Sequence, residues 1–374
     1  MSVKKIAVIG AGLMGSGISY VSAWSSYDVT MVDVNDEALE RGVERLRSYV
    51  TSGIKRGKLS DSEAKDLLGR VKTTTNLEEA VSDIDLVIEA VYENMEVKKD
   101  LFNRMDSVAS PRTILASNTS SLSISELGKS TARPAKVIGM HYFSPVPAMK
   151  LLEVVVGEQT SKSTIDTAIA VGHSQGKTTV RAKDSPGFIV NRLGAQILRA
   201  SVLVFEQGIA TAGEIDSAMK EQFGMPMGPL ELTDFVGIDV SFSTMTTLYR
   251  AFGNCFKPPA TLTELVESGT IGRKTGSGFY EYGDQQPRTE EAKGADPVKI
   301  ALRIIVPYLR EAMIEVETAI AVEEDIDKAM KLGRNFKEGP FETIERLGRD
   351  TVRKELRKLQ EQFGDCYSPP KMLQ

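Results

Sequence analysis

The sequence predicts an α/β domain with a mostly parallel sheet, followed by an all-α region in two repeated copies. Short β-branched runs alternate with helical stretches over the first half of the chain, which is typical of βαβ units. Almost every later segment has helical periodicity. Within that helical half, residues 214–237 and 325–348 match without a gap at a constant offset of 111.

The first predicted strand, residues 3–9, is apolar, rich in β-branched residues and ends at a glycine. A helix to about residue 24 and a second strand at 28–34 follow, and Asn35 or Asp36 then caps a long helix. A further helix is expected around 95–107. The remaining strands of this sheet are expected at 71–75, 85–91, 113–118, 136–143, 151–157 and 177–182.

The character of the chain changes at the turn sequence DSPG, residues 184–187, after which nearly everything reads as helix. A glycine-rich polar stretch then precedes the second copy, which lacks the DSPGFIVN opening of the first. We expect the second copy to cover an apolar face that the first would otherwise expose. The predicted division is a first domain at 1–184, a helical domain at 185–283, a linker at 284–297 and a degenerate second repeat at 298–374.

Composition excludes several classes of protein. With 41% hydrophobic and 26% charged residues and a net charge of −5, the 374-residue chain resembles neither a disordered protein nor a nucleic-acid binder. No apolar run reaches the roughly 18 residues of a membrane span, so we expect a cytoplasmic protein. Cys255 and Cys366 are far apart in sequence and lack metal-ligand spacing, which predicts two free thiols and no metal site.

A glycine motif follows the first strand and opens the first helix. The G-x-G-x-x-G pattern permits a tight turn, close approach of the backbone to a pyrophosphate, and close helix–strand packing. The N–H groups at the helix start can then hold phosphates. This context predicts a Rossmann-type, dinucleotide-binding domain, against the alternative of a turn that only packs helix on sheet. The loop residues are Gly10, Gly12, Leu13, Met14 and Gly15.

Asp33, at the tip of the second predicted strand, favours NAD over NADP. A carboxylate at this point can accept hydrogen bonds from the adenosine ribose hydroxyls and repels a 2′-phosphate. The next residues, Val34, Asn35 and Asp36, include no arginine that could bind such a phosphate.

His141 is the better candidate of the two histidines for acid–base chemistry. Oxidising an alcohol by hydride transfer needs a base with a pKa near neutral, and histidine is the usual one. Glu153 lies in the apolar run LLEVVV, where a lone carboxylate is costly unless it has a partner. It could orient His141, or it could be a salt-bridged edge-strand residue. His173, on a predicted helix, reads as a surface histidine.

Five ordered motifs resemble the L-3-hydroxyacyl-CoA dehydrogenase family, which includes bacterial 3-hydroxybutyryl-CoA dehydrogenases. The resemblance covers residues 3 to about 282, and the last 90 or so residues resemble the duplicated C-terminal domain of fused β-oxidation enzymes. The motifs are GAGLMGSGI, SNTSSLSISEL, HYFSPVPAMKLLEVV, DSPGFIVNRL and MPMGPLELTDFVG.

The resemblance implies roles for single residues. His141 matches the catalytic histidine of the family and Glu153 its carboxylate partner. Ser120 and Asn191 match polar residues that bind the reacting oxygens of the substrate and the nicotinamide side. The remaining implied contacts are Glu93 and Lys98 near the cofactor and the CoA thioester arm, and Lys274 near the cofactor.

Two departures from the family pattern concern binding. Ser144 stands where the family commonly has asparagine, which puts one cofactor contact in doubt. The family's CoA-phosphate lysine has no exact match, although Lys55, Arg56 and Lys58 could supply that charge together; the alternative is a solvated basic helix end.

The implied activity is the reversible, NAD-dependent oxidation of (S)-3-hydroxyacyl-CoA, with 3-hydroxybutyryl-CoA as substrate, in fatty acid metabolism. Two alternatives stay open: a dehydrogenase of a free hydroxy acid on the same scaffold, and a non-catalytic NAD-binding or structural protein. The partner is then an acyl-CoA, with no nucleic acid and no membrane. The protein is expected as a homodimer, or as a monomer whose two helical copies pair internally.

Overall fold

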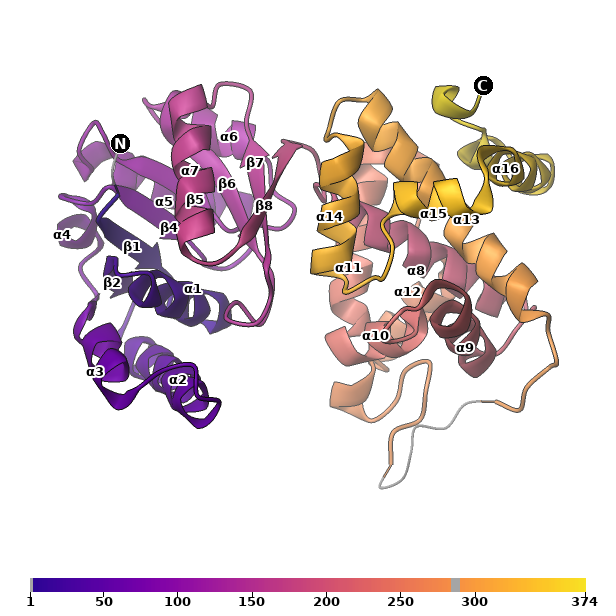
Figure 1. Cartoon of the computed structure of the whole chain (residues 1–374), viewed down its shortest axis with the longest axis horizontal. Coiled ribbons are helices and arrows are strands. Elements are labelled where there is room, and N and C mark those ends of the chain that lie inside the picture. Colours follow the sequence, from indigo (N-terminus) through magenta and orange to yellow (C-terminus); the bar gives the residue numbers. More distant parts are fainter. Residues whose placement is uncertain (1–2, 284–289) are drawn as a thin grey trace. The chain divides into compact units, whose positions relative to one another are not determined.

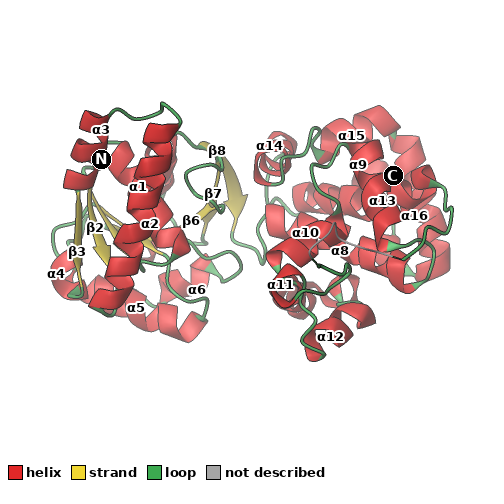
Figure 2. Cartoon of the chain, turned by 90° about the horizontal axis from the view of Figure 1, so that it is seen from below, coloured by secondary structure: helices red, strands yellow, loops and turns green. Residues whose placement is uncertain are grey.

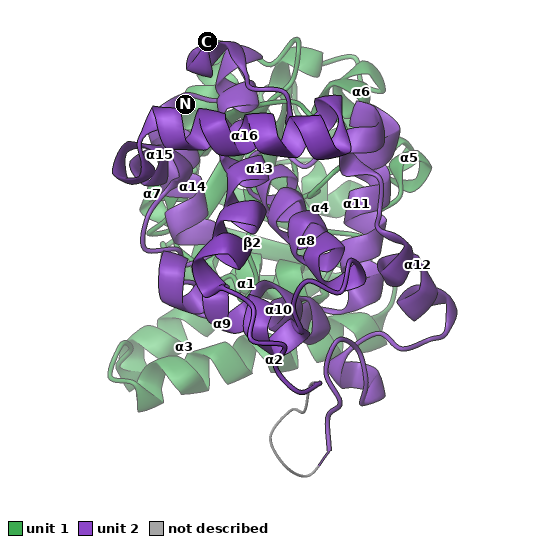
Figure 3. Cartoon of the chain, turned by 90° about the vertical axis from the view of Figure 1, so that its right-hand side faces the viewer, with its two compact units in different colours: residues 1–185 green, residues 186–374 purple. Residues whose placement is uncertain are grey.

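The computed structural model describes residues 3–283 and 290–374, which form two compact units, residues 1–185 and 186–374 (Figures 1 and 3). The first unit alternates strands and helices as the sequence predicts. Its elements are β1 (Lys5–Ile9), α1 (Leu13–Trp24), β2 (Asp28–Val32), α2 (Asp36–Lys55), α3 (Asp61–Gly69), β3 (Val71–Thr74), α4 (Leu77–Val81), β4 (Leu86–Glu89), α5 (Met95–Val108), β5 (Ile114–Ser117), α6 (Ile124–Lys129), β6 (Val137–Tyr142), β7 (Leu151–Val156), α7 (Lys162–Ser174) and β8 (Thr178–Lys183).

The eight strands form one sheet in the order β3-β2-β1-β4-β5-β6-β7-β8. Among the described strands only β6 and β7 pair antiparallel; the other neighbours are parallel. The prediction of an α/β domain with a mostly parallel sheet is confirmed. Because parallel strands end at the same edge, the residues that follow β1, β2, β4 and β5 share the carboxyl edge of the sheet.

The central strands are buried on both faces, because helices cover both sides of the sheet (Figure 2). Successive residues of β4, from Leu86 to Ile88, are all 0% exposed, and Leu86 and Ile88 belong to one apolar core. Because these strands are packed in the core, their carboxyl ends have defined positions. The polar side chains that follow the strands are therefore held in defined positions too.

The second unit is helical, as predicted, and is built from α8 to α16 with short 3₁₀ turns. The predicted linker at 284–297 falls partly outside the described residues, and residues 290–296 form no helix or strand. The helices are α8 (Val190–Glu206), α9 (Ala212–Phe223), α10 (Pro229–Val236), α11 (Ile238–Phe252), α12 (Ala260–Glu267), α13 (Pro297–Glu317), α14 (Glu323–Gly333), α15 (Pro340–Leu347) and α16 (Arg349–Phe363).

Some contacts recur within this unit at the offset of 111 that the sequence shows. Asp216 accepts hydrogen bonds from the backbone N–H groups of Leu230 and Glu231 at the start of α10. Asp327 does the same for Phe341 and Glu342 at the start of α15. Each carboxylate therefore satisfies helix N–H groups that lack an intrahelical partner. The recurrence supports the predicted repeat, which stays a prediction.

The prediction of two free thiols is wrong, because Cys255 and Cys366 form a disulfide with their Cα atoms 5.1 Å apart. Both cysteines lie in 3₁₀ turns, at 253–256 after α11 and at 365–367 after α16, and they are separated by the repeat offset of 111. Sequence distance was a poor guide here, since the packing of the second unit brings the two turns together.

Within residues 3–283 and 290–374, no helix is long and apolar enough to cross a membrane, and no group of His, Cys, Asp and Glu could hold a metal ion.

We expect reduction of the Cys255–Cys366 bond to lower the stability of the second unit. A cross-link over a loop of this length restricts the unfolded chain, and its loss typically costs about 2–5 kcal/mol. Thermal melts with and without reductant measure the difference. The Cys255→Ser/Cys366→Ser variant should melt like the reduced protein in both conditions, whereas two free thiols in the denatured, unreduced protein would contradict the bond.

Candidate active site

The glycine loop between β1 and α1 has the geometry that a close-approaching ligand needs. Gly10 has φ +104°, and a Cβ there would lie 2.6 Å from the carbonyl oxygen of Ala90. At Gly15 a Cβ would lie 1.7 Å from the oxygen of Gly10, so helix and loop pack too closely for any side chain. A Cβ on Gly12 would meet nothing within 4 Å, and no side chain caps α1 there. The loop therefore fits a pyrophosphate at the helix start.

Asp33 follows β2 at the same edge of the sheet and is tied to the glycine loop. Its Oδ2 accepts a hydrogen bond from the backbone N–H of Ala11 at 2.7 Å, and its Oδ1 accepts one from Val34 at 2.7 Å. The carboxylate thus fixes the loop and places a negative charge beside it. Such a charge favours ribose hydroxyls over a 2′-phosphate, so the residues present fit NAD.

His141 and Glu153 face each other across the antiparallel pair β6–β7. The histidine Nδ1 lies 2.6 Å from Glu153 Oε2, which is a hydrogen bond, and Glu153 is 0% exposed. A carboxylate on Nδ1 orients the ring and stabilises the imidazolium, which leaves Nε2 as the nitrogen that can take a proton from a ligand. His141 is 6% exposed. This geometry is suited to acid–base chemistry.

The loop after β5, which carries Ser120, is held by carboxylates at both ends. Glu93 Oε1 accepts hydrogen bonds from the hydroxyl of Thr119 at 2.5 Å and from the backbone N–H of Ser120 at 3.0 Å. Asp184 accepts hydrogen bonds from the Ser123 hydroxyl and from the N–H groups of Ile124 and Ser125. The loop therefore has a fixed shape at the carboxyl edge.

Lys98 lies deeper than the sequence suggests. Its side chain is 1% exposed, with Nζ 2.6 Å from Glu89 and 3.1 Å from Glu93. Because its side chain is almost completely buried, Lys98 has little surface that could contact a ligand directly. Burial raises the pKa of Glu93, but the Lys98 charge and the Thr119 hydroxyl outweigh this effect and lower it. Glu93 is therefore a carboxylate at neutral pH.

The other predicted residues lie on exposed segments or in the second unit. Ser144 is exposed in the loop between β6 and β7, and the basic residues Lys55, Arg56 and Lys58 are exposed at the end of α2. In the second unit, Asn191 lies in the first turn of α8, and Lys274 forms an ion pair with Asp239 at 2.7 Å.

The sequence analysis did not identify Glu89 or Lys177 as residues that support the site. Glu89 offered the same signal as Glu153, a lone carboxylate in an apolar strand. Lys177 precedes β8 in a polar stretch without any distinguishing pattern, so only the structure reveals its burial.

Two family models match the chain. The NAD-binding domain of 3-hydroxyacyl-CoA dehydrogenase matches residues 5–185, and the C-terminal domain of the same family matches residues 187–282 and 300–374. The chain belongs to the 3-hydroxyacyl-CoA dehydrogenase family. It is an NAD-dependent oxidoreductase, as the sequence predicts.

The relatives agree with this assignment. The 3-hydroxybutyryl-CoA dehydrogenase of Clostridioides difficile is 43% identical over 279 residues, which are 74% of this chain and 99% of that protein. A fatty acid oxidation complex subunit alpha of Shewanella oneidensis is 35% identical over 384 residues, 98% of this chain and 54% of that one. The solved 3-hydroxybutyryl-CoA dehydrogenase of Escherichia coli K12 superposes with a TM-score of 0.93 at 30% identity, covering 100% of this chain and 98% of that chain.

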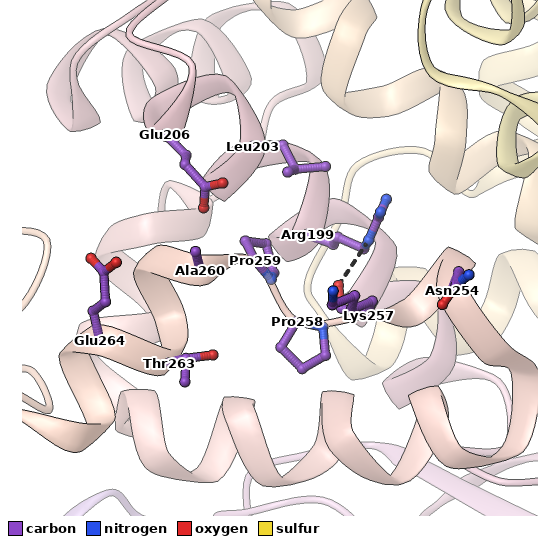
Figure 4. A pocket seen from close by; sticks show the side chains of 10 residues that line it. All are labelled: Arg199, Leu203, Glu206, Asn254, Lys257, Pro258, Pro259, Ala260, Thr263 and Glu264. Atoms are coloured by element: carbon purple, nitrogen blue, oxygen red, sulfur yellow. Dashed lines mark hydrogen bonds between the residues drawn. The ribbon is translucent and has the colours of Figure 1, made fainter.

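A hollow on the second unit of the dehydrogenase contains none of the predicted site residues. It has a volume of about 620 Å³ and lies between α8, α12 and the turn that joins α11 to α12 (Figure 4). Arg199, at one side of it, donates a hydrogen bond to the Lys257 carbonyl, and Glu206 accepts hydrogen bonds from Thr261. Two charged side chains of opposite sign in its lining are thus bound to the protein itself.

Lys177 braces the loop that joins the His141 strand to the Glu153 strand. Its Nζ donates hydrogen bonds to the carbonyl oxygens of Val146 and of Met149, the latter at 2.8 Å. Burial lowers the pKa of this lysine to about 8. The neutral amine still has two hydrogens, enough for both carbonyls.

We expect Lys177 to make the dehydrogenase more stable as pH rises above about 8, because its pKa falls from 10.5 to about 8 on folding. Between these values the unfolded chain binds the extra proton, so the free energy of unfolding increases with pH. Denaturant titrations of wild type and Lys177→Met at about pH 7, 8 and 10 measure this difference, with the exposed Lys150→Met as control. Parallel pH profiles for wild type and Lys177→Met would contradict it.

Proposed function

We propose that this chain catalyses the reversible, NAD-dependent oxidation of (S)-3-hydroxyacyl-CoA to 3-oxoacyl-CoA, with 3-hydroxybutyryl-CoA as substrate. The observation that carries the proposal is the His141–Glu153 hydrogen bond of 2.6 Å at a buried carboxylate. The 3-hydroxybutyryl-CoA dehydrogenases among the relatives support the substrate. The residues of the pair have the chemistry that proton removal from an alcohol requires.

His141 Nε2 accepts the hydroxyl proton of the substrate while the C3–H bond breaks. The glycine loop and Asp33 would hold NAD, which would supply the hydride acceptor; the balanced products would be a 3-oxo thioester, NADH and a proton on the imidazole. Glu153 stabilises the imidazolium that forms, because its charge is sealed from water next to Nδ1. In the reverse direction the imidazolium donates the proton to the forming alcohol.

Other residues of the chain bind and orient. Ser120 and Asn191 hold the reacting oxygens and the nicotinamide side, while Asp33 and the glycine loop hold the rest of the cofactor. Ser144, Glu93 and Lys274 complete the cofactor contacts. The exposed basic group at the end of α2 offers positive charge for the CoA phosphates: Lys55, Arg56 and Lys58.

A substrate comparison tests the proposal against a dehydrogenase of free hydroxy acids. NADH consumption with acetoacetyl-CoA is measured beside acetoacetate and other free oxo acids, followed by acyl-CoAs of increasing chain length. The proposal expects a higher kcat/KM for the thioesters, with the four-carbon substrate preferred. Turnover of free acids alone would favour the alternative, and binding of NADH without any turnover would favour the non-catalytic protein.

The substitution His141→Gln should lower kcat by about 10²–10⁴-fold, since it removes the base. Binding of NADH should stay within about twofold of wild type, because the change is local to the proton-transfer step. His173→Gln is the matched control: that histidine is exposed, its Nε2 contacts Thr179, and turnover should not change. Unaltered turnover in His141→Gln would overturn the assignment.

For the oligomeric state we propose a monomer in which the two helical segments pair internally. The long helix α13 packs along α8 and α9 within the second unit and buries apolar residues such as Ile304 and Ile305. Light scattering should therefore give a mass near 40.8 kDa. Twice that mass at micromolar concentration would instead support the homodimer.

A further inference from the structure

We propose that Glu89 is a positioning residue of the site: it fixes Lys98, and through Lys98 and Glu93 it fixes the loop that carries Ser120. The inference rests on the proposed function for the roles of Glu93 and Ser120. Glu89 itself is buried at the edge of the sheet, with 0% of its surface exposed.

Glu89 is the last residue of β4 and is 0% exposed. Its Oε1 accepts hydrogen bonds from Lys98 Nζ at 2.6 Å and from the backbone N–H of Val91 at 2.7 Å. Its Oε2 accepts one from the Ser117 hydroxyl on β5 at 2.6 Å. Both oxygens are thus held by donors from separate segments, and the carboxylate has one position.

Lys98 carries the constraint from Glu89 to Glu93. The ammonium group contacts both carboxylates, but only Glu93 is accessible, with 36% of its side chain exposed. A buried ammonium group is tolerated only where it is paired. Because Glu89 is the immobile partner, it determines where Nζ lies, and Nζ in turn determines where the Glu93 carboxylate lies.

Glu93 then sets the backbone of the loop after β5, through the Thr119 hydroxyl and the N–H of Ser120. The same carboxylate is close to the Ser121 hydroxyl, at 3.3 Å. The charged groups of Glu89, Lys98 and Glu93 therefore form an unbroken chain of contacts. This path runs from the interior of the sheet to the loop that carries Ser120, the residue proposed to bind the reacting oxygen.

Glu89 also acts on the glycine loop. It lies opposite Ile9, the residue before Gly10, in the pairing of β4 with β1. By holding the N–H of Val91 it fixes the turn of Ala90, whose carbonyl oxygen is the atom that excludes a side chain at Gly10. Glu89 therefore positions both loops that receive ligands in the proposed function.

A contribution to stability does not by itself explain why the buried Glu89–Lys98 ion pair is present. Buried ion pairs contribute little net stability, because desolvation of the charges offsets their attraction, and apolar side chains of similar volume often serve as well. A positioning role explains why charge is kept here: the path must end on an accessible carboxylate, which an apolar pair cannot hold in place.

The test is Glu89→Gln, which keeps the shape and removes the charge. We expect the Kd for NADH, measured by fluorescence without substrate, and the KM for acetoacetyl-CoA to rise about five- to tenfold, while kcat falls less than threefold. Glu96→Gln is the matched control, since it makes the same change at an exposed carboxylate of α5 that pairs with Lys99 and not with Lys98; its Kd and KM should stay within twofold.

The path is tested by combining Glu89→Gln with Glu93→Gln. If Glu89 acts on the Ser120 loop through Glu93, the double variant should raise the KM for acetoacetyl-CoA no more than Glu93→Gln alone, whereas its loss of NADH affinity should be larger because Glu89 also holds the glycine loop. Increases in KM that multiply, or a Kd for NADH within twofold of wild type in Glu89→Gln, would overturn the inference. If Glu89→Gln does not fold by circular dichroism, Glu89→Asp, which retains the charge but withdraws it, undergoes the same test.

Failure of the inference and failure of the proposed function are distinguishable. NADH binding needs no acyl substrate, so the Glu89 result stands even if the wild-type protein turns over no 3-hydroxyacyl-CoA. Conversely, turnover that depends on His141 with unchanged binding in Glu89→Gln would leave the proposed function intact and remove only the role of Glu89.

Discussion

The antiparallel pairing of β6 with β7 is the constraint on which the candidate site depends. It brings His141 directly opposite Glu153 in a sheet whose other described strand pairs are parallel. A parallel neighbour needs a long crossover, whereas an antiparallel one can return through a short loop. His141 and Glu153 can therefore lie twelve residues apart in sequence and still share one hydrogen bond. Lys177 then holds that short loop by its carbonyl groups.

Two buried glutamates show how the sheet supports chemistry at its edge. Glu153 and Glu89 are both 0% exposed, and each has donors placed by neighbouring elements. Removing a carboxylate from water is costly, so its position is tightly defined wherever it is tolerated. One glutamate orients a histidine and the other a lysine. In both cases a buried carboxylate of the sheet supplies a negative charge at a defined position. The side chain that this carboxylate orients, His141 or Lys98, is slightly more exposed than the glutamate.

Much of this arrangement follows from sequence, because the patterns involved are local. Strand periodicity located the sheet, and the glycine motif with Asp33 indicated the cofactor edge. The lone carboxylate in LLEVVV pointed to the partner of His141. Contacts set by tertiary packing do not follow from sequence: Glu89 is also a lone carboxylate in an apolar strand, but its partner Lys98 lies on another element, and only folding brings the two together.

The disulfide shows the same limit. The repeat offset of 111 separates Cys255 from Cys366, but an offset in sequence becomes a distance only when the two segments are packed. Here the packing places equivalent turns side by side, which no local pattern of the chain indicates.

The second helical segment, residues 298–374, supplies a charged partner to the first. Features that recur at the offset of 111 are structural: the guanidinium of Arg192 lies 4.2 Å from the Phe252 ring, and that of Arg303 lies 4.2 Å from the Phe363 ring. The buried Glu311 on α13 breaks the pattern, since its counterpart is Ala200. Glu311 binds Arg192 at 2.6 Å. The segment therefore supplies a charge partner to α8 beside Asn191, which the first segment lacks at the equivalent position.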